Sequence, residues 1–313
     1  MAEIMDKMRV ALLAGGTSGE REVSLRGAEA VAAALDPDKF TLRHFDPAHD
    51  LAALAAACDE IDFALIILHG VGGEDGTLQG MLDLLGIPYQ GSGVLGSALA
   101  MDKDLAKELY KIARLPTADW LTLVPGQTVD TEAIIARLAL PVVVKPVREG
   151  SSLGLSIVRD RAALLSGIGR AGGDKRAVMI ERFIPGRELT VGVVGNDRLE
   201  ALPLIEIVPG AKYEFFDYEA KYQPGASDEI CPAPVSDAIR EQAQEYAMRA
   251  HRALRLAGYS RTDMRLAPDG NLYLLETNTI PGMTATSLLP KMAAAHGWSF
   301  SQLLEKLIKL GMK

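Results

Sequence analysis

The sequence has few cysteines, no excess of basic residues and no long apolar run. Its two cysteines, Cys58 and Cys231, lie far apart without CxxC spacing or a histidine cluster, which argues against a disulfide framework or a structural zinc site. The net charge of -8 argues against a general nucleic-acid-binding protein. The first residues lack the basic region and apolar core of a signal peptide, and no later run reaches membrane-spanning length. We therefore expect a cytoplasmic protein with neither nucleic acid nor membrane as a partner.

The first hundred residues alternate between strand and helix patterns. The stretches "RVALLAGG", "FTLRHFD" and "DFALIILHG" are typical of strands, whereas "SLRGAEAVAAAL", "LAALAAA" and "TLQGMLDLLG" are typical of helices. This alternation predicts a parallel sheet with crossover helices, an α/β arrangement. Because open α/β sheets bind ligands at the carboxyl ends of their strands, Glu20 and His69 should lie on one rim.

Beyond Pro116 the pattern changes to short strands and turns, which predicts an α+β region with an antiparallel sheet. A polar loop at about 211–225, with Gly and Pro, is long enough to be a lid. A helix is expected at about 236–257. The expected strands of this region are 141–146, 153–158, 177–184, 188–195 and 199–208.

A hairpin is predicted near the end of the chain, where Asp-Gly at 269–270 is a strong two-residue turn signal. Pairing the flanking residues across this turn sets Asp263 opposite Glu276 and Arg261 opposite Asn278. Since side chains alternate along a strand, all four point to the same face. The opposite face is then apolar and suited to a core, with Met264, Leu266, Tyr273 and Leu275.

Facing carboxylates at Asp263 and Glu276 repel each other unless a cation lies between them. Two carboxylates and the amide of Asn278 suit a hard cation such as Mg²⁺, which takes few protein ligands and completes its shell with water and phosphate. The alternative is a solvated face on which Arg261 and Arg265 neutralise the acids.

An anion site is indicated where Lys145 ends an apolar strand and the small-residue loop 150–154 follows. Such a loop can turn several backbone N–H groups toward one phosphate, although most Gly-Ser loops are only turns. The sequence has no GxxxxGK[ST] motif, which excludes a P-loop. The strand at 181–184 could present its backbone to an adenine edge, with Glu181 and Glu188 as partners of the ribose or the amine. Taken singly, each of these glutamates is better explained as a surface carboxylate.

Seven stretches, taken together, resemble the D-alanine:D-alanine ligase family of the ATP-grasp superfamily. They occur in family order and span nearly the whole chain, so the resemblance is specific. They are "GGTSGEREVSL", "HGVGGEDGTLQG", "GSGVLGSALAMDK", "KPVREGSSLG", "ERFIPGRE", "FDYEAKY" and "LETNTIPGMTATSLLP".

The resemblance implies a mixed α/β and α+β chain: an ATP-grasp fold with an N-terminal Rossmann-like (pre-ATP-grasp) domain. The implied domains are 1–100, a central domain at 101–186 and a C-terminal domain at 187–313 that carries the lid. It also implies a homodimer, ATP held between the last two domains, and ATP-dependent ligation of two D-alanine molecules through an acyl phosphate.

Site residues implied by the resemblance fall into three groups. ATP would contact Lys103, Lys145, Gly150, Ser152, Glu181, Arg182, Phe183, Ile184 and Glu188. Two ions, Mg²⁺ or Mn²⁺, would be bound by Asp263, Glu276 and Asn278. The first D-alanine would contact Glu20, Ser151, Tyr222, His69 and Lys221, and the second would contact Arg261, Gly282, Ser287 and Leu288.

The sequence departs from the family pattern at Thr277, where an aliphatic residue is usual. Thr277 should point to the other face of its strand, away from the metal. Two other functions stay open: a ligase of the same superfamily that uses D-lactate, D-serine or another acceptor, and a nucleotide-binding module without catalysis. A tyrosine at Tyr222 resembles the dipeptide-forming members, and His69, Ser287 and Glu20 each have purely structural explanations as capping or dipole residues.

Overall fold

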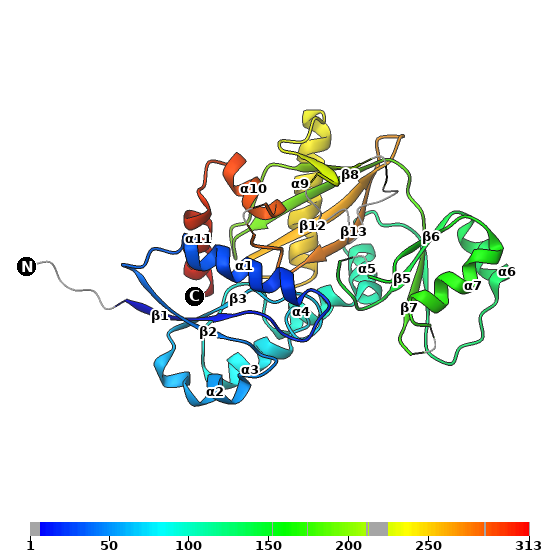
Figure 1. Cartoon of the computed structure of the whole chain (residues 1–313). Helices are drawn as coiled ribbons and strands as arrows, with labels where there is room; N and C mark the ends of the chain where they lie inside the picture. The colour runs from blue at the N-terminus through cyan, green and yellow to red at the C-terminus, as the bar shows by residue number, and fades with distance from the viewer. Residues whose placement is uncertain are drawn as a thin grey trace, which may run out of the picture.

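Three β-sheets follow one another along the chain (Figure 1). The computed structural model describes residues 7–151, 153–173, 175–210, 212, 225–284 and 286–312. The predicted lid at about 211–225, with Lys221 and Tyr222, therefore lies almost wholly outside the described residues, as does Ser152.

The first sheet is parallel, as the alternation predicts, with strand order β2-β1-β3. Helices cover both faces, so the central strand is a continuous apolar run in which Val10 to Leu13 are buried. Its elements are β1 (Met8–Leu13), α1 (Arg21–Ala34), β2 (Phe40–Phe45), α2 (Leu51–Ala56), η1 (Cys58–Glu60), β3 (Phe63–Ile66) and α3 (Thr77–Leu85).

The second sheet is antiparallel, with strand order β4-β7-β5-β6. One face packs under two helices that the sequence patterns did not predict. Asp130 and Asp160 cap them by accepting hydrogen bonds from the backbone N–H three residues on. The elements are β4 (Trp120–Leu123), α6 (Thr131–Leu138), β5 (Val142–Pro146), β6 (Ser156–Val158), α7 (Arg161–Arg170) and β7 (Val178–Arg182).

The third sheet is antiparallel along the path β11-β10-β8-β12-β13, and β9 pairs with β8. The prediction of a single strand at 199–208 is wrong. This stretch forms two strands, one on each side of Pro203, which has no N–H to donate to a strand ladder. The strands are β8 (Arg187–Val194), β9 (Glu200–Ala201), β10 (Ile205–Pro209), β11 (Ser227–Ile230), β12 (Tyr259–Leu266) and β13 (Leu272–Asn278).

Among the described residues, five further helices lie around the first and third sheets (Figure 1). Residues of α1, α10 and α11 join both sheets in one core, whereas α4, α5 and α9 contribute to a second core on the third sheet. The middle sheet has a core of its own. These helices are α4 (Val94–Met101), α5 (Lys103–Ile112), α9 (Asp237–Ala253), α10 (Leu288–Ala295) and α11 (Phe300–Gly311).

The β12–β13 hairpin has the expected register at its open end but not at its turn. Asp263 pairs with Glu276 and Arg261 with Asn278, as predicted. The turn, however, has three residues, because Ala267 N–H donates to the Asn271 carbonyl and Gly270 takes φ 86°. A β-bulge beside Asp263 then restores the predicted register.

The predicted core face of the hairpin is wrong for strand β13. Met264 and Leu266 are buried as expected, but their core partners are Leu272 and Leu274. Tyr273 and Leu275, which the two-residue turn assigned to the core, lie only half-buried, since the three-residue turn shifts the pairing by one.

Candidate active site

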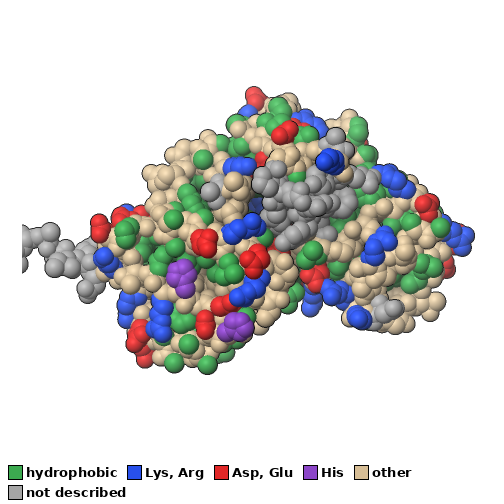
Figure 2. Space-filling model, in the orientation of Figure 1, with side chains coloured by type: hydrophobic (Ala, Val, Ile, Leu, Met, Phe, Trp, Pro, Cys, Tyr) green, Lys and Arg blue, Asp and Glu red, His purple; other side chains and the backbone are tan. Residues whose placement is uncertain are grey.

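Two adjoining clefts share Gly150 and Glu276 in their walls. The first lies between the second and third sheets, with residues of β5, β7, β8, β12 and β13 in its wall. The second is lined by turns that follow strands of the first sheet, by Gly150 and Ser151, and by β12 and the segment after β13. On the face drawn in Figure 2, Lys and Arg side chains lie next to Asp and Glu side chains around the middle of the molecule. We call the cleft that contains Lys145 the lysine cleft and the cleft that contains Glu20 the acidic cleft.

The lysine cleft brings together every described residue expected at the nucleotide. They come from the N-terminus of α5, strand β5, the small-residue loop 150–154, which we call the glycine loop, and strands β7 and β8 with the segment between them. They are Lys103, Lys145, Gly150, Glu181, Arg182, Phe183, Ile184 and Glu188.

The acidic cleft brings together every described residue expected at the amino acids. These residues come from turns after β1 and β3, from the glycine loop, and from β12 and the segment after β13. They are Glu20, His69, Ser151, Arg261, Gly282, Ser287 and Leu288.

A buried carboxylate between two lysines forms one wall of the lysine cleft. Glu181 accepts a hydrogen bond from Lys145 Nζ at 2.6 Å and another from Lys107 Nζ at 2.7 Å. Burial by itself raises the pKa of Glu181, but the two ammonium groups outweigh it and hold that pKa below its usual value. Sequence reasoning missed Lys107, although its spacing of four from Lys103 places both on one side of α5.

Residues at the N-terminus of α5 contact the two residues that precede the glycine loop. Lys103 Nζ donates to the Glu149 carbonyl at 2.6 Å and lies 3.4 Å from the Glu276 carboxylate. Asp102 accepts a hydrogen bond from Arg148 Nε at 2.8 Å. A Cβ on Gly150 would overlap the Glu20 carboxylate, so a larger residue at position 150 would displace that carboxylate.

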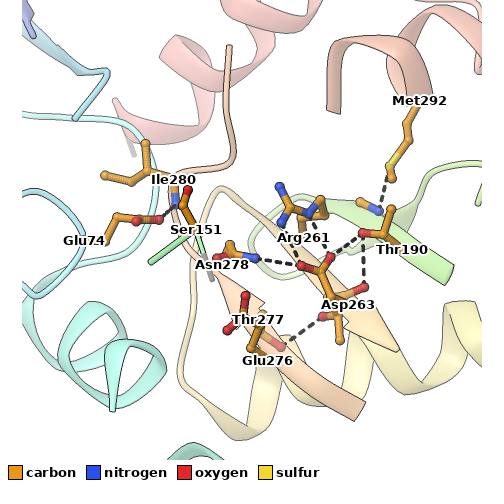
Figure 3. A network of polar contacts seen from close by, with 12 residues as sticks. Glu74, Ser151, Thr190, Arg261, Asp263, Glu276, Thr277, Asn278, Ile280 and Met292 are labelled. Atoms are coloured by element: carbon orange, nitrogen blue, oxygen red, sulfur yellow. Dashed lines mark hydrogen bonds and ion pairs between the residues drawn. The ribbon is translucent and has the colours of Figure 1, made fainter. Parts of the chain in front are cut away.

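Asp263 lies at the centre of a polar network on the hairpin face (Figure 3). Its carboxylate accepts hydrogen bonds from Thr190 Oγ1 at 2.6 Å, Arg261 Nε at 2.8 Å and Arg261 Nη2 at 2.7 Å. Asn278 Nδ2 donates to the same carboxylate at 3.2 Å. Arg265, which the solvated-face alternative assigned to these acids, instead contacts Glu188 at 3.2 Å.

The residues expected to bind a metal have donors that fit a hard cation. Asp263, Glu276 and Asn278 offer two carboxylates and an amide on adjacent strands. No group of three or more His, Cys, Asp or Glu suited to a metal occurs in the described ranges. Water or phosphate would therefore have to complete the coordination shell. Thr277 faces away as expected, hydrogen-bonded to Tyr110 and Thr262.

Glu20 and Ser151 meet across the acidic cleft, where Ser151 Oγ donates to Glu20 Oε1. Glu20 directly precedes α1, at the end of the helix where the dipole favours a carboxylate, and its side chain makes no cap hydrogen bond. His69 is buried, and burial lowers the pKa of its imidazole, which favours the neutral form.

Glu74 is a second buried residue that sequence reasoning missed. Its carboxylate accepts hydrogen bonds from Gly70 N–H at 2.8 Å and from Ile280 N–H at 3.3 Å (Figure 3). Burial, together with the nearby charge of Glu20, raises the pKa of Glu74 to about 8. Glu74 thereby ties the turn after β3 to the segment that leads to Gly282. Its place within "HGVGGEDGTLQG" was the available signal.

The far wall of the acidic cleft is a close-fitting turn. Ser287 Oγ accepts a hydrogen bond from Thr284 N–H at 3.0 Å and does not cap α10, contrary to the capping explanation. A Cβ on Gly282 would lie 2.9 Å from Ser287 Oγ. The turn therefore requires a small residue at position 282.

Comparisons with known proteins cover almost the whole chain. The family described as "D-ala D-ala ligase C-terminus" matches residues 109–309, and "D-ala D-ala ligase N-terminus" matches residues 43–92. A D-alanine–D-alanine ligase of Desulfotalea psychrophila is 62% identical over 98% of this chain and 96% of its own, and that of Syntrophobacter fumaroxidans is 58% identical over 98% and 99%.

Solved structures agree with these sequence matches. A D-alanine–D-alanine ligase from Bacillus anthracis complexed with ATP superposes with a TM-score of 0.85 at 34% identity, covering 97% of each chain. The VanG D-Ala:D-Ser ligase from Enterococcus faecalis superposes with a TM-score of 0.82 at 32% identity, covering 97% of this chain and 99% of that one.

Proposed function

The chain belongs to the D-alanine–D-alanine ligase family, with the ATP-grasp fold, and on that premise we propose how its own residues join two D-alanine molecules. The reaction consumes ATP and yields D-alanyl-D-alanine, ADP and phosphate, for peptidoglycan precursor synthesis. The observation that carries the proposal is that the lysine cleft and the acidic cleft meet at Gly150 and Glu276. A nucleotide in one cleft and an amino acid in the other would therefore meet at these two residues.

The first step activates a carboxylate, since a free carboxylate does not react with an amine. A carboxylate oxygen of the first D-alanine attacks the γ-phosphorus of ATP, the bond to the β-phosphate oxygen breaks, and an acyl phosphate and ADP form. Lys145, Lys103 and the backbone N–H groups of the glycine loop supply positive charge around the transferred group. The family resemblance implies two ions of Mg²⁺ or Mn²⁺. Asp263, Glu276 and Asn278 would hold them, and they would add positive charge there.

The second step forms the peptide bond. The neutral amine of the second D-alanine attacks the acyl carbon, the bond to phosphate breaks, and the amine loses a proton. We assign Glu20 to the ammonium group of the first D-alanine and Arg261 to the carboxylate of the second. The Gly282 N–H would stabilise the tetrahedral oxyanion, with Ser287 shaping the turn beside it.

Water must be kept from the acyl phosphate, which hydrolyses. The expected lid, with Tyr222 and Lys221, lies outside the described residues, so its roles stay predictions. The same is true of Ser152 at the glycine loop and of the division into domains at 1–100, 101–186 and 187–313.

We also propose that the protein acts in the cytoplasm as a homodimer. Within the described ranges, no helix is both long enough and apolar enough to span a bilayer. An apolar surface on α3 and α4, with Leu84 91% and Leu95 61% exposed, is compatible with a subunit contact. Size-exclusion chromatography with light scattering would reveal a monomer if this is wrong.

Acceptor choice is the open alternative, because a D-Ala:D-Ser ligase is among the structural relatives. ADP release should be measured with D-alanine alone, and then with L-alanine, D-serine or D-lactate added, and the products identified by mass. We expect rapid ADP release and D-alanyl-D-alanine with D-alanine alone. ADP release that depends on D-serine or D-lactate would favour the alternative, and no ADP release with any acceptor would support the non-catalytic nucleotide-binding module.

A further inference from the structure

We propose that Lys107 is a positioning residue that keeps Glu181 paired, so that Lys145 can leave Glu181 and turn to the phosphates of a bound nucleotide. This inference rests on the proposed nucleotide site. Lys107 was not among the residues expected at that site from the sequence. It does not line the lysine cleft, whereas Lys145 and Glu181 both do.

The three side chains form a charge cluster that is almost fully buried. The exposed fractions are 0% for the Lys107 side chain, 3% for Glu181 and 8% for Lys145. Each oxygen of the Glu181 carboxylate has one ammonium partner, Lys107 on Oε2 and Lys145 on Oε1. The cluster therefore carries one more positive than negative charge.

This surplus charge decides what Lys145 can do. If Lys145 moves toward phosphate, Glu181 still has Lys107 as its counter-ion. Without Lys107, the same movement would leave an almost fully buried carboxylate with no cation beside it, which is strongly unfavourable. Lys145 would then stay on Glu181 and would be lost to the phosphates.

A packing role for Lys107 makes a different prediction. Its Nζ also lies over the Trp120 ring, 5.0 Å from the ring centroid, so its removal could disturb α5 in general. Such damage would weaken binding of any ligand in the lysine cleft. Loss of the counter-ion should weaken only ligands whose phosphates need Lys145.

The test is isothermal titration of the full chain with ATP, ADP and adenosine in the presence of Mg²⁺ and without D-alanine. For Lys107→Met we expect the Kd of ATP and ADP to rise about tenfold or more, while the Kd of adenosine stays within about twofold. Lys107→Arg, which keeps the charge, should restore ATP binding. Lys111→Met is the matched control. Lys111 is one turn along α5 and its Nζ also lies over Trp120, 4.7 Å from the ring centroid, but it pairs with Glu108 and not with Glu181.

Two results would overturn the proposal. One is unchanged ATP binding by Lys107→Met, and the other is an equal loss of ATP and adenosine. A double-mutant cycle keeps the test decisive should Lys107→Met not fold: in a Glu181→Gln background, adding Lys107→Met should leave the Kd of ATP unchanged, and a further loss there would refute the mechanism. If the unmodified chain binds adenosine but not ATP, the proposed function fails first, and this inference fails with it.

Discussion

Replacing Arg261 with Met should destabilise the fold far more than the same change at Arg9. Both arginines make bidentate ion pairs with an aspartate. Arg261 donates to Asp263 at 2.7 and 2.8 Å, and Arg9 donates to Asp62 at 2.6 and 3.1 Å. They differ in solvation. Side-chain exposures are 15% and 10% for the Arg261–Asp263 pair but 49% and 36% for the Arg9–Asp62 pair.

The expected loss for Arg261→Met is about 3 kcal/mol of unfolding free energy. Removing one partner of a buried pair costs about 3–5 kcal/mol, because the other charge stays buried and unpaired. The lower end applies because Asp263 keeps its hydrogen bonds from Thr190 and Asn278. The exposed pair of Arg9 and Asp62 is screened by water, so Arg9→Met should lower the unfolding free energy much less.

Urea unfolding at neutral pH, followed by far-UV circular dichroism and by the fluorescence of Trp120 and Trp298, measures both losses. Adding Mg²⁺ should raise the unfolding midpoint of Arg261→Met more than that of the unmodified chain, since a cation on Asp263 would replace the missing charge. Similar losses for the two variants would refute the role of burial. An equal effect of Mg²⁺ on variant and unmodified chain would count against Asp263 as a metal ligand.

Three further outcomes follow from the site and the core. Lys145→Ala should remove most ATP-dependent turnover with D-alanine, and normal dipeptide synthesis by that variant would refute its role. Gly282→Ala should lower kcat, measured by ADP release, more than it raises the KM of ATP, because the added Cβ meets Ser287 Oγ at 2.9 Å and not the lysine cleft. Burial and the charge of Arg252 lower the pKa of His251 from 6.5 to about 4, so the unfolded chain binds the proton more readily and stability is lost as pH falls from 6.5 toward 4. The loss at pH 5 should be about 2 kcal/mol, and His251→Gln should flatten that part of the pH profile of urea midpoints.

The sequence predicted those parts of the fold that depend on local residue patterns and on the alternation of side chains between the two faces of a strand. The parallel sheet at the start of the chain and the antiparallel strands beyond it follow from alternation and turn residues. Helices α6 and α7 were missed, although Asp130 and Asp160 stand at their starts with the spacing of capping residues. The strand patterns around these helices were stronger than the single capping signals.

The sequence could not predict partners that are distant along the chain. A lysine on a helix is usually exposed, and Lys107 is buried only because Glu181, 74 positions away, lies against it. Glu74 likewise meets Ile280 across 206 positions. The residue pattern of one segment does not show which distant segment will pack against it. The burial of these charges is therefore visible only in the folded chain.

The β-bulge in the hairpin is the feature that a regular strand could not have supplied. Neighbouring residues of a regular strand point to opposite faces, yet Leu275 and Glu276 both line the lysine cleft. The extra residue at the bulge turns both side chains to one face, so an apolar wall and a carboxylate stand side by side there. A two-residue turn with no bulge would pair Asp263 with Glu276 equally well, but it would send Leu275 into the core. The bulge therefore adds an apolar side chain to the wall of the lysine cleft, the proposed nucleotide site, without disturbing the pairing of the proposed metal ligands.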